Sequence, residues 1–227
     1  MPAAASWLTA CAAALVLGVI AALMAATLSA NVHRRPVGVA TRLPTTTVVA
    51  IGDSIMDGHG LDPSQAWPAV VAGYDGWRLV NLASDGAGFV TKGNDGAIFA
   101  DQVTEAVELD PTMVIISGSS NDLGVPEADV QQSMVSAMDT LRQDLPHARI
   151  VAVSPVWNES EPPAELDQIN TDMKAAVKAV GGTYIDIGTP LLGKPGDMQS
   201  DDVHPTSDGQ LVIAADVEEG LEKSHIV

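Results

Sequence analysis

The chain has 227 residues, of which 46% are apolar and 18% are charged, so it is too apolar for a disordered protein and long enough for one ordinary domain. Its 11 basic and 29 acidic side chains give a formal net charge of −18, which disfavours binding to the phosphate backbone of nucleic acids. The only cysteine in these residues is Cys11, so no disulfide can form within them.

The first segment of the chain, residues 1–35, differs from the rest in charge and hydropathy. It contains no Asp or Glu, and an uncharged apolar run of 22 residues extends from Trp7 to Leu28. Such a run is long enough to cross a hydrocarbon core of ~30 Å as a helix. We therefore expect residues 1–35 to be an N-terminal transmembrane or signal helix.

Two locations follow for the remainder of the chain. Either a single N-terminal helix anchors an extracytoplasmic domain to the membrane, or cleavage after small residues such as Ser29 and Ala30 releases a secreted domain. Arg34 and Arg35 follow the apolar run and no basic residue precedes it, a pattern that favours a cytoplasmic domain under the positive-inside rule. The sequence leaves the orientation open.

Residues 36–45 contain Pro and Thr without periodicity and are expected to be a linker. From residue 46 to residue 227, short β-branched runs alternate with helical patterns. The five runs expected to be strands are Thr46–Ile51, Arg78–Leu82, Met113–Ser117, Arg149–Ser154 and Thr183–Ile187. Apolar residues at helical spacing predict helices within 130–145 and 166–180, and a last helix is expected from about Ser207 to Lys223.

This alternation predicts a single α/β domain over residues 46–227. Strands that are apolar almost throughout are typical of a parallel sheet covered on both faces, so we expect a three-layer α/β/α sandwich with a five-stranded parallel sheet. Ligands of such sheets bind beyond the carboxyl ends of the strands. The loops that follow the strands are therefore where the chemistry of this protein is expected.

Those loops carry the most distinctive polar residues of the chain. The first strand runs into Gly52-Asp53-Ser54, Gly86 and Asn121 follow the second and third strands, and Asp201-Asp202-Val203-His204-Pro205 lies near the C-terminus. A serine hydroxyl is un-ionised at neutral pH and needs a base to act as a nucleophile, and His204 can supply that base. Asp201 lies three residues earlier, so one helical turn would bring it to the same side and let it fix the tautomer of His204. A glycine N–H and an asparagine side chain can stabilise developing negative charge.

In these ordered blocks the chain resembles the SGNH/GDSL hydrolase superfamily over roughly residues 46–223. The first block is matched by Gly52-Asp53-Ser54 with Trp67-Pro68, the second by Gly86, the third by Asn121 and the last by the segment from Asp201 to Pro205. Ser119 stands two residues before Asn121, where the family usually has glycine. The resemblance implies a flavodoxin-like fold and the hydrolysis of acyl esters through an acyl-enzyme intermediate.

The resemblance also implies a role for each matched residue. Ser54 would be the nucleophile, His204 the base and Asp201 the carboxylate that orients the base. The N–H groups of Ser54 and Gly86 and the side chain of Asn121 would form the oxyanion hole.

The expected partners are an ester substrate and the membrane. The ester could be a small molecule, a glycan or a lipid, and no metal or organic cofactor is expected, because Asp53, Asp57 and His59 lack a full ligand set at suitable spacing. One alternative function is acyl transfer to a sugar hydroxyl by the same residues. The other is a catalytically silent, cell-surface glycan-binding domain, which would not need a complete set of serine, histidine and aspartate.

Overall fold

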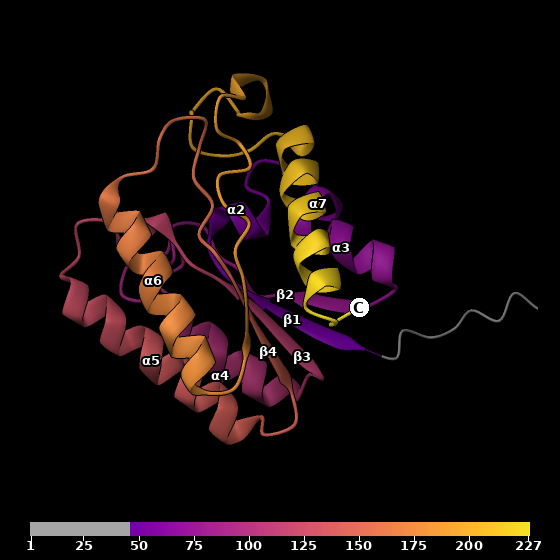
Figure 1. Ribbon diagram of the computed structural model, residues 1–227, viewed down its shortest axis with the longest axis vertical. Coiled ribbons are helices and arrows are strands. Elements are labelled where there is room, and N and C mark those ends of the chain that lie inside the picture. Colours follow the sequence, from indigo (N-terminus) through magenta and orange to yellow (C-terminus); the bar gives the residue numbers. More distant parts are fainter. Residues whose placement is uncertain (1–45) are drawn as a thin grey trace, which may run out of the picture. The chain divides into compact units, whose positions relative to one another are not determined.

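The computed structural model of this protein describes residues 46–227 (Figure 1). Its centre is a five-stranded sheet in which every neighbouring pair of strands is parallel. The strands are β1 (Thr47–Ile51), β2 (Arg78–Asn81), β3 (Met113–Ser117), β4 (Arg149–Val153) and β5 (Thr183–Ile185). Their order across the sheet is β2-β1-β3-β4-β5, which is the flavodoxin-like order.

Helices cover both faces of the sheet and complete three layers. One face is covered by α4 (Phe99–Leu109), α5 (Glu127–Asp144) and α6 (Ala164–Ala179). The other carries α2 (Ser54–Asp57), α3 (Trp67–Asp75) and α7 (Ser207–Lys223). Figure 1 shows α4, α5 and α6 on one side of the strands and α3 and α7 on the other. Three short 3-10 helices lie in the loops, at Pro63–Gln65 (η1), Ser120–Asp122 (η2) and Pro195–Asp197 (η3).

The central strands are buried on both faces, which explains their continuous apolar sequences. In β1, Val49 and Ile51 pack toward α4, α5 and α6, whereas Val48 and Ala50 pack toward α3 and α7. Burying one such branched side chain stabilises the fold by roughly 1.5–3 kcal/mol. The core therefore fixes the carboxyl edge of β1 and β3, where the polar loops begin.

The predicted strands and last helix agree with the structure to within two residues. The largest difference is at β5, which ends at Ile185 rather than at Ile187, because the N–H of Ile187 donates to the hydroxyl of Ser154 instead of to a neighbouring strand. The helices α3 and α4 have no counterpart among the sequence predictions.

The predicted anchor in residues 1–35 and the predicted linker in residues 36–45 lie outside the described residues. Among residues 46–227, none of the helices combines the length and the apolarity needed to cross a bilayer.

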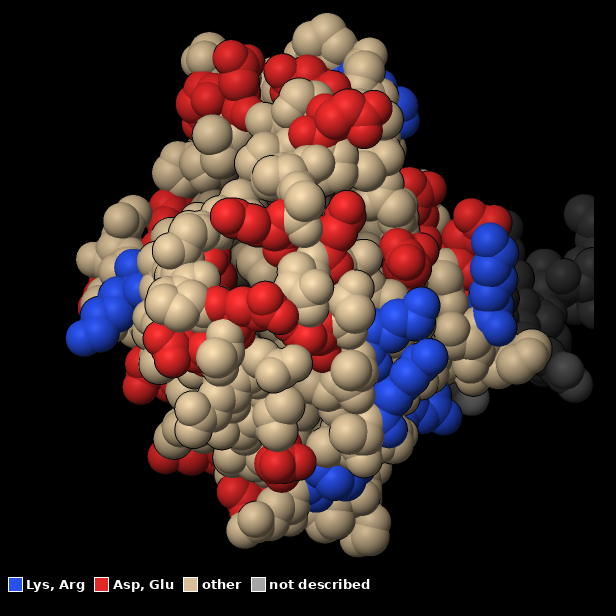
Figure 2. Space-filling view, turned by 60° about the vertical axis from the view of Figure 1, so that its left-hand side comes forward, with Lys and Arg blue, Asp and Glu red and all other residues tan. Residues whose placement is uncertain are grey.

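Acidic side chains predominate on the surface, as the composition requires. Figure 2 shows Asp and Glu spread over much of one face, with the Lys and Arg side chains in separate groups nearer its margins. The face in this view is therefore predominantly acidic.

Candidate active site

Ser54 lies where β1 passes into α2, at the carboxyl edge of the sheet. The buried Asp53 carboxylate caps α2 by accepting a backbone N–H at 3.0 Å. The N–H and C=O of Gly52 both bond to the side-chain amide of Gln102, at 2.9 and 3.0 Å. A Cβ at Gly52 would lie 2.6 Å from Sδ of Met56, so the close packing of this turn requires glycine. These contacts fix the position of Ser54.

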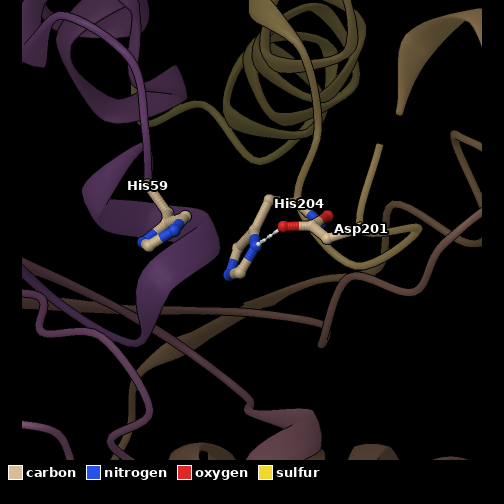
Figure 3. Close-up of side chains that lie close together, drawn as sticks. All are labelled: His59, Asp201 and His204. Carbon is tan, nitrogen blue, oxygen red and sulfur yellow. Dashed lines mark hydrogen bonds and ion pairs between the residues drawn. The ribbon is translucent and has the colours of Figure 1, made fainter. Parts of the chain in front are cut away.

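The side chains of Ser54, His204 and Asp201 form a hydrogen-bonded chain. Oγ of Ser54 lies 3.0 Å from Nε2 of His204, although 150 residues separate the two in sequence. Nδ1 of the same ring lies 2.7 Å from Oδ2 of Asp201 (Figure 3). The structure thus brings together the three residues that the sequence predicts to act jointly.

The segment that carries Asp201 and His204 is a turn, so the expectation of a helical turn between them is wrong. A bridge between Met198 and Pro205 closes the turn. Inside it, Oδ1 of Asp201 accepts the backbone N–H groups of both Val203 and His204, each at 3.0 Å. This side-chain-to-backbone bonding replaces helix geometry as the reason that the carboxylate and the imidazole face each other.

The hydrogen bonds to Asp201 also determine its charge. The bond from the His204 ring is the largest cause of a pKa well below the usual range of an aspartate, and the backbone N–H groups of His204 and Val203 lower the pKa further. Its neighbour Asp202 is exposed, and the Asp202 side chain makes no hydrogen bond to any group within residues 46–227. Asp201 is therefore the carboxylate that the geometry directs at the imidazole.

Another carboxyl group, that of the buried Asp53, lies beside the serine and contacts the loop after β3. Oδ2 of Asp53 is 2.7 Å from the hydroxyl of Ser119, which is itself fully buried. Burial is the largest influence on Asp53 and raises its pKa, whereas the hydrogen bond to Ser119 lowers it. Ser119 also accepts the N–H of Asn121 at 3.1 Å. The serine that stands in place of the family's usual glycine thus connects the loops after β1 and β3.

The three groups expected to bind an oxyanion lie in the loops around Ser54. Among residues 46–227, neither the N–H of Ser54 nor that of Gly86 donates to a protein group, so both are available to a ligand. Gly86 has a φ of +78°, in the left-handed region that favours glycine. Nδ2 of Asn121 donates to the carbonyl oxygen of Ala87 at 2.9 Å, which uses one of its two hydrogens.

Asp122 holds the loop that follows Gly86 against η2. Its carboxylate accepts three backbone N–H groups at 2.6–3.1 Å, from the consecutive residues Phe89, Val90 and Thr91. The Thr91 hydroxyl donates in turn to the carbonyl oxygen of Asn121 at 2.8 Å. The oxyanion candidates on the two loops are therefore held by one buried carboxylate.

His59 is a further residue of this site, and no motif in the sequence predicts its contact with His204. Its ring stacks on the ring of His204, with the centroids 4.1 Å apart and the planes inclined by 27° (Figure 3). Its Nδ1 lies 2.6 Å from Oδ2 of Asp85, the residue before Gly86. Because the contact joins residues far apart in the chain, only the tertiary structure brings His59 next to the catalytic candidates.

His59, Asp201 and His204 offer ligand-type atoms within 4.8 Å of one another. Both oxygens of Asp201 are already occupied, since one accepts from the His204 ring and the other from two backbone N–H groups. A metal ion would have to displace these bonds. The hydrogen bonds of Asp201 thus account for the position of its carboxylate without a ligand role.

Comparisons with known proteins agree with the family resemblance and with the fold. The model of the GDSL-like Lipase/Acylhydrolase family matches residues 50–212. GDSL lipase Rv0518 of Mycobacterium tuberculosis is 28% identical over 182 residues, which cover 74% of this chain and 78% of that protein.

Two solved structures show the same fold at lower sequence identity. The psychrotrophic esterase EstA from Pseudoalteromonas sp., inhibited by monoethylphosphonate, superposes with a TM-score of 0.65 at 18% identity, over 80% of this chain and 100% of that one. The salicylyl-acyltransferase SsfX3 of a tetracycline biosynthetic pathway superposes with a TM-score of 0.62 at 19% identity, over 80% and 55%. With the family match spanning most of the described residues, the chain belongs to the GDSL-like lipase/acylhydrolase family.

Proposed function

We propose that this protein hydrolyses carboxylic esters with Ser54 as the nucleophile, His204 as the general base and Asp201 as the residue that orients the base. The observation that carries the proposal is the contact of 3.0 Å between Oγ of Ser54 and Nε2 of His204, while Nδ1 of that ring faces Asp201 at 2.7 Å. A hydrogen bond from Nδ1 to a carboxylate leaves the lone pair of Nε2 directed at the serine hydroxyl.

The reaction would proceed in two acyl-transfer steps. Oγ of Ser54 attacks the ester carbonyl carbon as its proton moves to Nε2 of His204, which gives a tetrahedral intermediate. Collapse of the intermediate breaks the bond to the alkoxy oxygen, and the imidazolium returns the proton to the leaving alcohol. Water then attacks the acyl-enzyme, losing a proton to His204, and the carboxylic acid leaves as Ser54 regains its hydrogen.

The negative charge of each tetrahedral intermediate requires preorganised donors. The free N–H groups of Ser54 and Gly86 and the remaining Nδ2 hydrogen of Asn121 are the groups we assign to this oxyanion hole. Asp122 and Thr91 support the assignment, because their hydrogen bonds fix the loops that carry Gly86 and Asn121.

The proposed substrate is a small-molecule, glycan or lipid ester, because the triad and the oxyanion hole would act on any accessible acyl ester. Acyl transfer to a sugar hydroxyl is the second candidate function, and the fold shared with the acyltransferase SsfX3 favours keeping it. Both reactions form the same acyl-enzyme and differ only in whether water or an alcohol accepts the acyl group. Adding a sugar to the assay as acceptor distinguishes the two reactions, since a transferase would form the sugar ester faster than the free acid.

The location proposed for the enzyme follows from the apolar segment Trp7–Leu28. We propose that this segment either anchors an extracytoplasmic catalytic domain or directs its secretion. Protease accessibility in intact cells, with and without permeabilisation, tests the orientation.

The test of the catalytic proposal is the Ser54→Ala variant on a chromogenic short-chain ester. Loss of the nucleophile should reduce kcat by several orders of magnitude and abolish labelling by a serine-reactive phosphonate. Ser136→Ala, an exposed position on α5, is the matched control and should behave like the wild-type protein. Full activity of Ser54→Ala, or phosphonate labelling at another serine, would overturn the proposal.

A further inference from the structure

The site contains two pairs of histidine and aspartate, stacked ring on ring. His204 with Asp201 is the pair assigned to the reaction, and His59 with Asp85 is the other, at nearly the same distance between nitrogen and oxygen (2.7 and 2.6 Å). The ring of His59 covers one face of the His204 ring at 4.1 Å. Figure 3 shows His59 extending from the end of α2 toward His204, which approaches from the opposite side on its turn.

The backbone and the ring of His59 are both fixed. Its N–H donates to the carbonyl oxygen of Ser54 at 3.0 Å, and its own carbonyl oxygen accepts Nε2 of Gln199 at 2.7 Å. Nδ1 bonds to Oδ2 of Asp85, whose other carboxylate oxygen is buried and has no partner within residues 46–227. Since an ionised carboxylate gains strongly from a hydrogen-bond donor, this bond constrains the orientation of the His59 ring.

His204 lies on the turn that the bridge between Met198 and Pro205 closes. Hydrogen bonds to Asp201 and Ser54 hold its two nitrogens, which fixes two points on the edge of the ring. The ring can still tilt about the line that joins these points. A contact on the face of the ring opposes that tilt, and His59 provides it.

We propose that His59 is a positioning residue, which holds the imidazole of His204 in the plane from which Nε2 reaches the hydroxyl of Ser54. This inference rests on the proposed function. His59 lies outside the triad of Ser54, His204 and Asp201, and its hydrogen bond to Asp85 fixes the orientation of its ring.

The surroundings of His59 also suit the charge that the reaction creates. His204 becomes a cation when it takes the serine proton, and carboxylates near it favour that charge. The carboxylates that face His59 are Asp85 and Asp57, and Asp57 has a raised pKa because of burial first and the proximity of Asp85 second. Asp85 bonds to His59, whose ring stacks on His204, so its carboxylate adds negative charge to the site in which the imidazolium forms.

The test compares His59→Ala with His59→Phe in the full-length protein, with a neutral chromogenic ester as substrate. Loss of the ring in His59→Ala should lower kcat by about two- to tenfold, the factor that corresponds to one aromatic pair, and leave KM unchanged. The flat ring of His59→Phe should restore most of kcat, although it cannot bond to Asp85. His147→Ala, an exposed histidine before β4, is the matched control and should have no effect on kcat.

Three results would overturn the inference: an unchanged kcat in His59→Ala, a raised KM with kcat maintained, or a His59→Phe variant no better than His59→Ala. If His59→Ala does not fold, the Asp85→Ala variant takes its place in the comparison. It keeps the His59 ring but removes the hydrogen bond that orients the ring, so kcat should again fall. Ser54→Ala in the same series identifies the cause of failure. If Ser54→Ala is inactive and His59→Ala has full activity, only the role of His59 is wrong. If Ser54→Ala is fully active, the proposed function itself is wrong.

Discussion

The side chain of Gln199 donates to the carbonyl oxygen of His59 at 2.7 Å, across 140 residues of sequence. The same Nε2 also donates to the carbonyl oxygen of Pro205 at 2.9 Å. One amide thus holds the turn of Asp201 and His204 against the segment that follows α2. The candidate nucleophile and its base are therefore positioned relative to each other by one side chain.

Asp201→Asn should impair turnover far more than Asp202→Asn. The asparagine cannot stabilise the imidazolium and disturbs the tautomer of His204. In serine proteases, replacing such a carboxylate lowers kcat by up to ~10⁴. Asp202 makes no side-chain hydrogen bond within the described residues, so its replacement should cost little. Steady-state kinetics of both variants check this ranking, and the reverse order would reject Asp201 as the orienting residue.

Asn121→Ala should lower kcat by about 10²–10³, the effect of removing one oxyanion-hole donor. The substitution also removes the hydrogen bond to Ala87, so a folding defect has to be excluded by thermal melting of the same sample. A kcat close to that of the wild-type protein in a folded variant would remove Asn121 from the oxyanion hole.

Ser119→Ala should destabilise the protein by about 1–3 kcal/mol, because it leaves the buried carboxyl of Asp53 without its side-chain partner. Ser136→Ala deletes a hydroxyl from an exposed position and controls for the change of residue type. Denaturant unfolding of the two variants measures the difference. Equal stability of Ser119→Ala and the wild-type protein would show that the contact between Asp53 and Ser119 does not hold the two loops together.

Asp75→Asn should stabilise the protein at neutral pH, and the gain should disappear in acid. Asp75 and Glu218 lie between α3 and α7, each with a buried carboxylate oxygen that lacks a partner within residues 46–227. Burial first and a neighbouring carboxylate second raise the pKa of both groups. An acid whose pKa is raised in the folded state does not destabilise the fold below its unfolded pKa, which is ~3.9 for Asp75 and ~4.3 for Glu218. The fold loses stability as the pH rises through the raised pKa of the folded state, because each acid then has to ionise where it is buried.

The measurement for this prediction is the melting temperature of Asp75→Asn minus that of the wild-type protein, from pH 4 to pH 8. The difference should be positive at pH 7 and approach zero near pH 4, where the wild-type carboxyl is protonated as well. Asp139→Asn, at an exposed position in the middle of α5, is the control and should give no comparable trend. A difference that grows as the pH falls would have the wrong sign for this mechanism.

A chain that begins at Pro36 should be soluble and should retain the kcat and KM of the full-length protein. The described residues 46–227 contain a complete sheet with both faces covered, so the domain does not need residues 1–35 to bury its core. Gel filtration and ester hydrolysis of the shortened chain check this. Aggregation or inactivity, with an active full-length protein, would contradict it.

Much of this arrangement is encoded locally and could be predicted from the sequence. The strands β1, β3 and β4 are continuous apolar runs, because a central parallel strand is buried on both faces whatever lies beside it. The polar residues that follow strands had to gather at one edge of the sheet. That placement, together with the resemblance to the SGNH/GDSL blocks, singled out Ser54, Gly86 and Asn121 before any contact was known.

The tertiary structure alone decided which side chains touch across that edge. The stacking of His59 on His204, the bond between Asp53 and Ser119 and the proximity of Asp75 to Glu218 each relate segments that no sequence periodicity connects. The turn that replaces the expected helical turn before His204 depends on backbone bonds to Asp201, which a spacing of three residues does not distinguish from a helix. Sequence patterns indicate which residues of one segment are buried, whereas these contacts depend on how closely folding brings remote segments together.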